Sequence, residues 1–250
     1  MLSIKHSSIS TCKTFFKQCN NIINHTACII NPHGVHIYSA NHKFSIFAIL
    51  DNETFNHFEC PHEIILQLSI QKINEIFSKH TAYHSLQITY NNCNSDSIQF
   101  IINKNTMYRI PCSIITNQKY IQKIKKINDV DNDVDYHVEF KVNPSYLYSI
   151  FKSVKQQNTQ HKKKITLTSH PDTQTIYIQN RPLEHSSLDT YRFVTPIKQT
   201  FYLEYIHQFI KNTIKNKFTS IEIGLYNDKS MKLELYINDY NYIHLYIPPL

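Results

Sequence analysis

Apolar positions along the chain repeat one pattern four times, in which an amphipathic helix is followed by two short strands. In each helical stretch apolar residues recur at i, i+3, i+4 and i+7, which is the spacing of one buried face. Lysines occupy the opposite side of each stretch. The four apolar sets are Cys12, Phe15, Phe16, Cys19, Ile22 and Ile23; Ile70, Ile73, Ile76 and Phe77; Leu147, Ile150, Phe151 and Val154; and Leu203, Ile206, Ile210 and Ile214.

Alternation of apolar and polar residues predicts the strands that follow each helix. Pro144 opens the third helix at a position where proline is allowed, and the fourth helical stretch runs from Phe201. The whole pattern predicts an α+β fold of two similar halves, with each sheet covered by a helix pair. The predicted strands lie at 27–30, 34–37, 44–50, 55–60, 86–90, 98–102, 107–115, 136–142, 165–167, 176–178, 221–225, 233–237 and 242–247.

A polar segment separates the two halves. Four lysines between 119 and 126 precede four aspartates between 129 and 135, a run too polar for a core. The segment is predicted to be either a solvated linker or a carrier of an apolar ridge, Ile121, Ile124 and Ile127, that a partner could bind. The chain is therefore divided into an N-terminal domain at 1–117, a connector at 118–135 and a C-terminal domain at 136–250.

Composition narrows the class of protein further. A share of 41% hydrophobic residues in 250 is ample for a core, whereas two glycines cannot build a Gly-rich phosphate-binding loop. The apolar runs are shorter than the roughly twenty residues of a membrane span, and residues 1–11 are too polar for a secretory signal. We therefore expect a soluble, intracellular protein. Six cysteines without the spacing of a disulfide framework are expected to be reduced thiols.

The charge balance favours a polyanionic partner. A net charge of +7 suits nucleic acid or an anionic membrane surface. Almost all of the positive charge comes from lysine, because arginine occurs only at 109, 181 and 192. Arginine is the side chain best suited to bidentate reading of bases. Contacts to a nucleic-acid backbone are therefore expected in preference to recognition of a base sequence.

Catalytic and metal sites are weakly indicated. The serines, histidines and acids show no spacing typical of a nucleophile with its base, so we expect no enzyme and no cofactor. His57, Cys60 and His62, like His25 and Cys28, lack a second ligand pair for zinc. The aspartates from 129 to 133 begin like a calcium loop, but Val134 replaces its glycine and Phe140 its glutamate. We therefore expect no metal.

Several stretches resemble the DNA sliding clamp, the proliferating-cell nuclear antigen family, over nearly the whole chain. They are 27–30 with 34–37, 39–46, 55–60, 194–195, 200–206 and 242–250. The resemblance implies a DNA-clamp fold whose two domains each place antiparallel sheets outside and two helices on the inner face. It also implies that subunits close into a ring, usually a trimer, around duplex DNA.

The lysines opposite the apolar stripes fit this resemblance. Mobile point charges on helices attract phosphates without locking one register, as sliding requires. Ordinary solvated helix faces are the alternative for any one of them. Glu204 departs from the family, where its position is usually basic. The candidate DNA-binding residues are Lys13, Lys17, Lys72, Lys79, Lys152, Lys155, Lys211 and Lys215.

The resemblance implies two protein-binding surfaces as well. Partner peptides would enter a groove formed by Ala40, Lys43, Ile46, Ile121, Ile124, Ile127, Tyr246 and Pro248. Subunits would pair edge strands at about 107–114 and 174–181, through Met107, Arg109, Ile110, Ile176 and Ile178. The connector is more basic than the family's, which favours partners with acidic residues. Pro111 lacks a donor for strand pairing, so a monomer or dimer stays open beside the trimer.

The expected function is that of a non-catalytic DNA polymerase processivity factor. Its expected partners are duplex DNA, DNA polymerase and other replication and repair proteins, with the need for a clamp loader left open. The alternatives are a clamp relative in checkpoint or repair, a viral late-transcription accessory factor, or a single-strand-binding module. An excess of asparagine, lysine, isoleucine and tyrosine suggests an AT-rich genome, such as that of a large DNA virus or a parasite. The expected location is the nucleus or a viral replication compartment.

Overall fold

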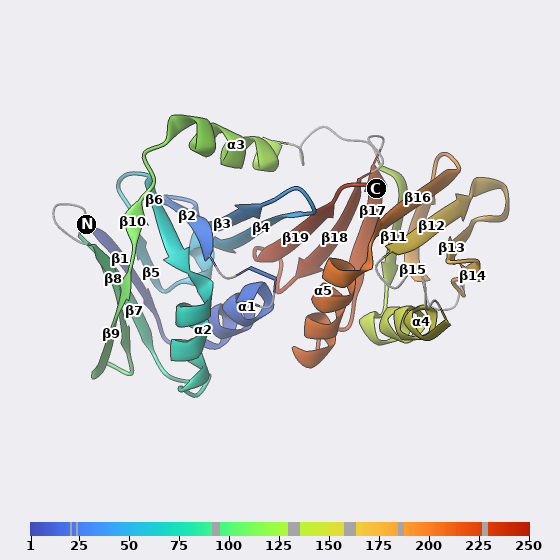
Figure 1. Ribbon diagram of the computed structural model, residues 1–250. Helices are drawn as coiled ribbons and strands as arrows, with labels where there is room; N and C mark the ends of the chain where they lie inside the picture. Colours follow the sequence, from blue (N-terminus) through green and yellow to red (C-terminus); the bar gives the residue numbers. More distant parts are fainter. Residues whose placement is uncertain are drawn as a thin grey trace. The chain divides into compact units, whose positions relative to one another are not determined.

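The structure of the chain is a computed structural model (Figure 1). It describes residues 1–20, 22–23, 25–91, 96–129, 136–157, 164–184, 188–226 and 230–250, and gives the backbone alone at 25, 126–129, 155–157 and 189–191. The chain forms two compact units. Unit 1 comprises Met1–Ser39, Ile46–Asn128 and Tyr236–Ile243, and unit 2 comprises Ala40–Ser45, Asp129–Leu235 and His244–Leu250.

Unit 1 contains two sets of hydrogen-bonded strands. Neighbouring strands whose register is defined run antiparallel to each other. The first set has the order β5-β1-β7-β8-β9, with β1 at Leu2–His6, β5 at His57–Glu59, β7 at Leu86–Tyr90, β8 at Ser97–Ile102 and β9 at Thr106–Pro111. The second has the order β10-β6-β2-β3-β4, with β2 at His25–Asn31, β3 at Gly34–Ala40, β4 at Ser45–Asp51, β6 at Ile64–Ser69 and β10 at Ser113–Ile114. A 3-10 turn, η1, spans Asn52–Thr54.

Two helices, α1 at Ser10–Asn20 and α2 at Ile70–Ser78, pack against each other in unit 1. The apolar stripes predicted for them are buried from Cys12 to Cys19 and from Ile70 to Phe77, whereas Ile22 and Ile23 lie beyond the end of α1. The Ser69 hydroxyl caps α2 by accepting a hydrogen bond from the Lys72 N–H. Local capping and one apolar face therefore fix this helix pair.

Unit 2 repeats the arrangement with antiparallel strands and a second helix pair. One run has the order β19-β18-β17-β11-β15, with β11 at Tyr136–Val142, β15 at Leu188–Phe193, β17 at Ile221–Tyr226, β18 at Met231–Tyr236 and β19 at Tyr242–Ile247. The other is β14-β13-β12-β16, with β12 at Lys164–His170, β13 at Thr175–Ile178, β14 at Arg181–Pro182 and β16 at Ile197–Tyr202. A 3-10 turn, η2, spans Pro171–Thr173.

The helices of unit 2, α4 at Pro144–Gln157 and α5 at Leu203–Lys215, also pack together. The Asn143 side chain accepts hydrogen bonds from the N–H groups of residues 145 and 146, and Pro144 takes the first helical position, as predicted. The fourth helix begins two residues later than predicted, because Phe201 still pairs with Ile165 in the sheet. The predicted α+β clamp fold is confirmed.

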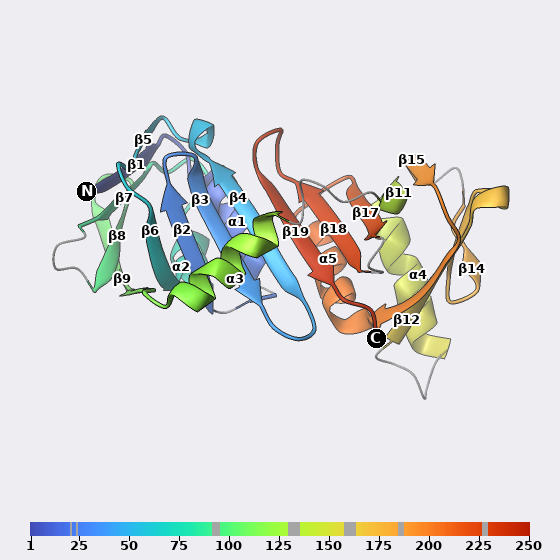
Figure 2. The same cartoon turned by 90° about the horizontal axis from the view of Figure 1, so that it is seen from above.

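The connector is not a solvated linker over its described part. Residues Gln118–Asp129 form a helix, α3, whose start is capped by the Asn117 side chain. Ile121 and Ile124 are buried, and Lys125 forms an ion pair with Glu63 of unit 1 at 2.8 Å. In Figures 1 and 2, α3 lies across β2 and β3 on the side opposite α1 and α2. Residues 130–135 lie outside the described part.

Each unit contains a short segment from the other half of the sequence. In unit 1, the buried Asn241 side chain accepts hydrogen bonds from the Asp51 N–H and the Thr54 hydroxyl, both at 2.8 Å. In unit 2, the Phe44 ring lies 4.5 Å from the Tyr205 ring, and the Lys43 ammonium lies 5.6 Å from the Tyr202 ring centre. Each unit therefore depends on a buried residue from the other half of the sequence, Asn241 in unit 1 and Phe44 in unit 2.

None of the helices within the described ranges has both the length and the apolar character needed to cross a membrane.

Candidate nucleic-acid interface

The four candidate lysines of unit 1 lie on its helix pair. Lys17, Lys72 and Lys79 are exposed, and Lys13 is half-buried. Lys17 stands in the last turn of α1 and Lys79 is the C-terminal cap of α2, where cations interact favourably with the helix dipole. The Lys13 ammonium donates a hydrogen bond to the His80 carbonyl at 2.6 Å. The helix pair of unit 1 thus carries three exposed lysines and one half-buried lysine that binds the backbone.

Unit 2 places its candidate lysines on the equivalent helix pair. Lys152 of α4 and Lys215 of α5 are exposed, and Lys211 is half-buried. The Lys155 backbone is helical, but its side chain lies outside the described part. Glu204, the departure noted in the sequence, is exposed in the first turn of α5, where a negative charge stabilises the helix dipole. A local structural reason therefore accounts for this carboxylate.

The residues predicted for the partner groove differ widely in exposure. Ile46, Ile121, Ile124 and Tyr246 are buried, Lys43 and Pro248 are half-buried and Ala40 is exposed. The Ile127 side chain lies outside the described part. Ile121 and Ile124 therefore do not form the exposed ridge that the sequence suggested, because α3 turns them inward. Any peptide that used these two residues would need α3 to move.

The predicted interface strands differ as well. β9 is an edge strand, and its Met107 and Arg109 side chains are exposed, while Ile110 is buried. β13 is not an edge, because β14 pairs with it, and its Ile176 and Ile178 side chains are fully buried. The edge in this sheet is β14, which contains Pro182. The edge expected at about 174–181 therefore lies at Arg181 and Pro182 and not at Ile176 and Ile178. A subunit interface through Met107, Arg109 and Ile110 stays a prediction.

The direction of the N–H groups along β9 follows from one hydrogen bond. The Cys112 N–H donates to the Asp96 carbonyl of the neighbouring segment at 2.8 Å. Because successive N–H groups alternate in direction in an antiparallel pair, those of Met107 and Arg109 point to the free edge. The nitrogen of Pro111 points the same way and has no hydrogen to donate. Two outward donors thus remain on this strand.

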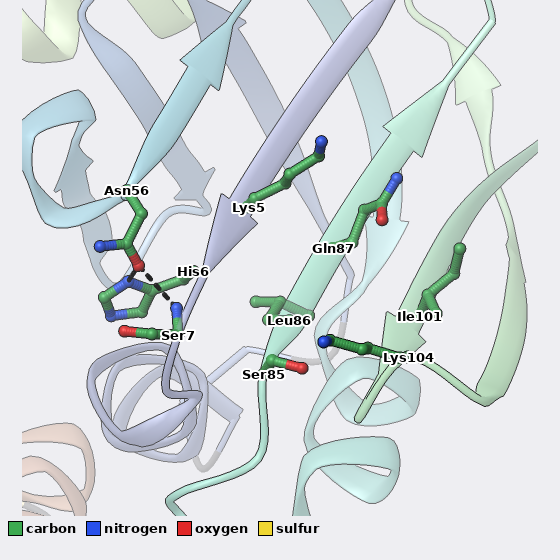
Figure 3. Close-up of a pocket in the computed structure, with 9 residues that line it drawn as sticks. All are labelled: Lys5, His6, Ser7, Asn56, Ser85, Leu86, Gln87, Ile101 and Lys104. Atoms are coloured by element: carbon green, nitrogen blue, oxygen red, sulfur yellow. Dashed lines mark hydrogen bonds between the residues drawn. The ribbon is translucent and has the colours of Figure 1, made fainter.

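A pocket that the sequence analysis missed opens on the β1-β7-β8 sheet of unit 1 (Figure 3). Its volume is about 340 Å³, and its lining includes Lys5 and Lys104 with no carboxylate. The Asn56 side-chain oxygen accepts a hydrogen bond from the Ser7 N–H at 2.6 Å and lies 3.1 Å from His6 Nδ1. The lining residues come from three stretches far apart in sequence, residues 5–7, Asn56 and residues 85–104, so no local motif could have indicated the pocket.

A buried group of polar residues lies in the sheet of unit 2. Glu234 binds the Lys232 ammonium at 2.8 Å, accepts a hydrogen bond from the Tyr136 hydroxyl at 2.6 Å and lies 3.3 Å from His244 Nε2. Burial raises the pKa of the Glu234 carboxyl, but the hydrogen bonds and charges of His244 and Lys232 outweigh burial and hold that pKa well below its usual range. Burial and the bond to Glu234 raise the pKa of Tyr136. Glu234 is therefore held ionised by its neighbours within the sheet.

The described cysteines behave as buried thiols. Cys12, Cys19, Cys28 and Cys60 are buried and Cys112 is half-buried, and all five are unpaired. Burial raises the pKa of Cys12 and that of Cys28 to about 12, which keeps both thiols protonated. Cys93 lies outside the described part.

Two similar α+β units, each with antiparallel strands and a helix pair that carries lysines, define a protein of the DNA-clamp class. The family model described as "Proliferating cell nuclear antigen, N-terminal domain" matches residues 1–135, so the chain belongs to the proliferating cell nuclear antigen family. Membership of this family makes the chain a sliding-clamp processivity factor in general terms, and the clamps of this family are non-catalytic. The resemblance seen in the sequence is thereby confirmed.

Two curated relatives extend the match beyond the N-terminal part. Both are named "Proliferating cell nuclear antigen 1" and come from Plasmodium falciparum, isolates K1 / Thailand and 3D7. Each is 20% identical, over 96% of this chain and 89% of the relative. At this identity the chain is a divergent member of its family.

Proposed function

We propose that this clamp holds duplex DNA by sequence-independent contacts between its helix lysines and phosphates. The observation that carries the proposal is that Lys17, Lys72, Lys79, Lys152 and Lys215 are exposed on helices whose apolar faces are buried. Lysine is a mobile point charge that attracts phosphate without fixing a register. Glu204 and the backbone-bound Lys13 reduce the number of charges available, so electrostatic attraction is moderate.

We propose further that the chain recruits DNA polymerase and other replication and repair enzymes through short peptides. By family resemblance the groove involves Ala40, Lys43 and Pro248, to which Lys43 adds a positive charge near Tyr202. A carboxylate beside the anchor residues of the peptide suits this lysine. The clamp would act in the nucleus or in a viral replication compartment.

Self-association is proposed through the free edge of β9. Met107 and Arg109 supply outward N–H donors and exposed side chains, which favours a homo-oligomer, with a trimer as the family's usual form. The two prolines, Pro111 of β9 and Pro182 of β14, shorten any ladder that these edges can form. A short ladder is weaker than an uninterrupted one, so assembly should depend on concentration.

The lysine contacts can be tested by salt dependence. Duplex DNA binding is measured over a range of salt concentrations for the full chain and for the double variant Lys72→Ala/Lys79→Ala. If both lysines contact phosphates, the slope of log affinity against log salt falls in magnitude by about 2. The matched control is Lys119→Ala/Lys123→Ala, which removes two exposed lysines of α3 from the other side of the unit 1 sheet.

An equal loss of slope in both double variants would contradict a specific role for the helix pair. Encirclement is tested separately, by retention on a closed circular duplex and release after linearisation. Tighter binding to linear single strands than to duplex would favour the single-strand-binding alternative over the proposed clamp.

A further inference from the structure

The loop that follows α2 brings two imidazoles together in unit 1. The Nδ1 atoms of His80 and His84 lie 3.3 Å apart, and the ring centres are 5.4 Å apart with planes inclined by 62°. Both side chains are half-buried, so part of each ring remains in contact with solvent. Two ring nitrogens therefore approach one another at the surface.

The separation of these nitrogens suits two ligands of one ion. Zinc binds histidine nitrogen at about 2.0–2.1 Å in tetrahedral geometry, which puts two ligand nitrogens about 3.3–3.4 Å apart. In the metal-free protein, one Nδ1–H can donate to the other Nδ1 across the same distance. The hydrogen bond thus holds the rings close to the arrangement that a cation requires.

The loop that carries the two histidines is fixed to α1 and to the segment before it. The Ile9 N–H donates to the His84 carbonyl at 2.9 Å, and the Ser8 hydroxyl donates to the Ala82 carbonyl at 2.6 Å. The Lys13 ammonium donates to the His80 carbonyl at 2.6 Å. Since the backbone is held at both histidines, binding an ion costs little additional ordering of the loop.

A third side chain orients the first imidazole. His80 Nε2 lies 2.9 Å from the hydroxyl oxygen of Tyr108, a residue of the edge strand β9. When Nε2 carries the proton and donates it to this oxygen, the lone pair of Nδ1 is left for a cation. Histidines that bind metals commonly have such a partner on the second nitrogen, because it fixes the tautomer and the ring orientation.

We infer that His80 and His84 form a two-imidazole binding site for a divalent cation of the zinc class, with water as the remaining ligands. Among the residues that the structure describes, no group of three or more histidines, cysteines and acids could hold a metal ion, so the described part of the chain supplies two ligands at this site. The ammonium groups of Lys13 and Lys79 lie near His80 and oppose any cation. Binding therefore relies on coordination by imidazole nitrogen, which suits zinc, whereas Mg²⁺ prefers oxygen ligands.

The site is tested by adding Zn²⁺ alone to the full chain in a buffer that does not bind metals and measuring the heat of binding by titration calorimetry. One equivalent of Zn²⁺ is expected to bind the unaltered chain. His80→Ala and His84→Ala should each weaken this binding at least tenfold, and Tyr108→Phe should weaken it less. His57→Ala is the matched control, because His57 is an exposed histidine whose ring lies 3.7 Å from the Glu59 carboxylate. This variant should still bind one equivalent of Zn²⁺ with unchanged affinity. Mg²⁺ should give no saturable heat.

Absence of saturable binding in the unaltered chain would overturn the inference. The inference would also be overturned if either His80→Ala or His84→Ala bound Zn²⁺ as tightly as the unaltered chain, or if His57→Ala abolished the binding. Should a histidine variant fail to fold, ¹⁵N imidazole spectra of the unaltered chain decide the question. The two Nδ1 resonances of His80 and His84 must then shift together on addition of Zn²⁺, and unchanged resonances would refute the site.

Discussion

Glu234 shows how strongly a single residue can depend on its neighbours. Its side chain is 7% exposed and that of Lys232 is 5% exposed, so neither charge is hydrated as it would be at the surface. Removing one partner of a buried ion pair leaves the other charge without compensation, which costs far more than the pair itself contributes. The stability of unit 2 is therefore sensitive to this carboxylate.

Glu234→Gln is expected to lower the free energy of unfolding by about 3 kcal/mol at pH 7, because Lys232 stays buried without a counter-charge. The folded carboxyl has a pKa below that of the unfolded chain, so its stabilisation is present above the unfolded pKa and lost as pH falls through the folded one. The difference between the variant and the unaltered chain should narrow below about pH 4.5. Urea unfolding at several pH values measures both effects.

The control is Glu222→Gln, whose carboxylate lies 3.6 Å from Lys141 with both side chains about a third exposed. This change should cost less than about 1 kcal/mol, because exposed ion pairs contribute little. Equal costs for the two variants would contradict the role assigned to burial.

The sequence was sufficient to place lysines on exposed helix faces, but it could not reveal the buried cluster of polar side chains around Glu234. Helical spacing is local, so Lys72 and Lys152 could be assigned to exposed faces from neighbours three and four residues away. Tyr136, Glu234 and His244 come from β11, β18 and β19, and only strand pairing brings them together. The His80 and His84 pair is local in sequence, yet the distance between the two rings depends on the conformation of the loop.

Several turns and one helix end among the described residues place side chains other than glycine in the left-handed region. Helix α5 ends in a Schellman motif, in which the Phe218 N–H donates to the Thr213 carbonyl and the Lys217 N–H to the Ile214 carbonyl. Lys217 occupies the left-handed position with φ of 62°, where glycine is usual. Asn103, Lys104 and Gln174 adopt the same region at other turns. Side chains with a Cβ therefore carry conformational strain at several element ends.

Lys217→Gly is expected to raise the free energy of unfolding by about 0.5–1 kcal/mol, because glycine adopts the left-handed conformation without the Cβ clash. Lys217→Ala removes the same charge and keeps the clash, so it should leave stability nearly unchanged. Lys215→Gly, inside the last turn of α5, should lower stability by up to about 1 kcal/mol. Thermal and urea unfolding measure the stability of the three variants. A Lys217→Gly variant no more stable than Lys217→Ala would contradict the strain argument.

At the element scale, α3 marks the limit of prediction from sequence. Ile121 and Ile124 are three residues apart and follow Asn117, a residue that favours the start of a helix. The lysines around them, however, indicated a segment exposed to solvent. Whether the isoleucines face a partner or the chain's own sheet depends on an unoccupied sheet face nearby. That information is non-local, because β2 and β3, across which α3 lies, are distant from it in the sequence. The burial of Ile176 and Ile178 likewise depends on packing that the local β13–β14 hairpin does not reveal.

For the whole molecule, the order of many weak sequence matches identified the family where single motifs could not. The exposed β9 edge is the feature that bears most directly on assembly, because it retains outward donors at Met107 and Arg109. Surfaces that depend on tertiary burial, such as the groove residues Ile46 and Tyr246, could not be assigned their exposure from the sequence.

Met107→Pro is expected to shift self-association to higher concentration, because it removes one of two outward N–H donors from β9 without removing a bond to β8. The solution mass is measured by light scattering over a range of concentrations. Met107→Leu keeps the donor and an apolar side chain, and should behave like the unaltered chain. A single monomeric mass for the unaltered chain at every concentration would contradict the proposed homo-oligomer.

The short segments exchanged between the halves of the sequence bear on attempts to produce either half alone. A gene split within the connector would yield an N-terminal fragment without Asn241, which is fully buried and holds Asp51 and Thr54. The C-terminal fragment would in turn lack Phe44, the aromatic neighbour of Tyr205. Neither product would contain a complete unit, so soluble material is expected from co-expression of the two fragments rather than from either one by itself.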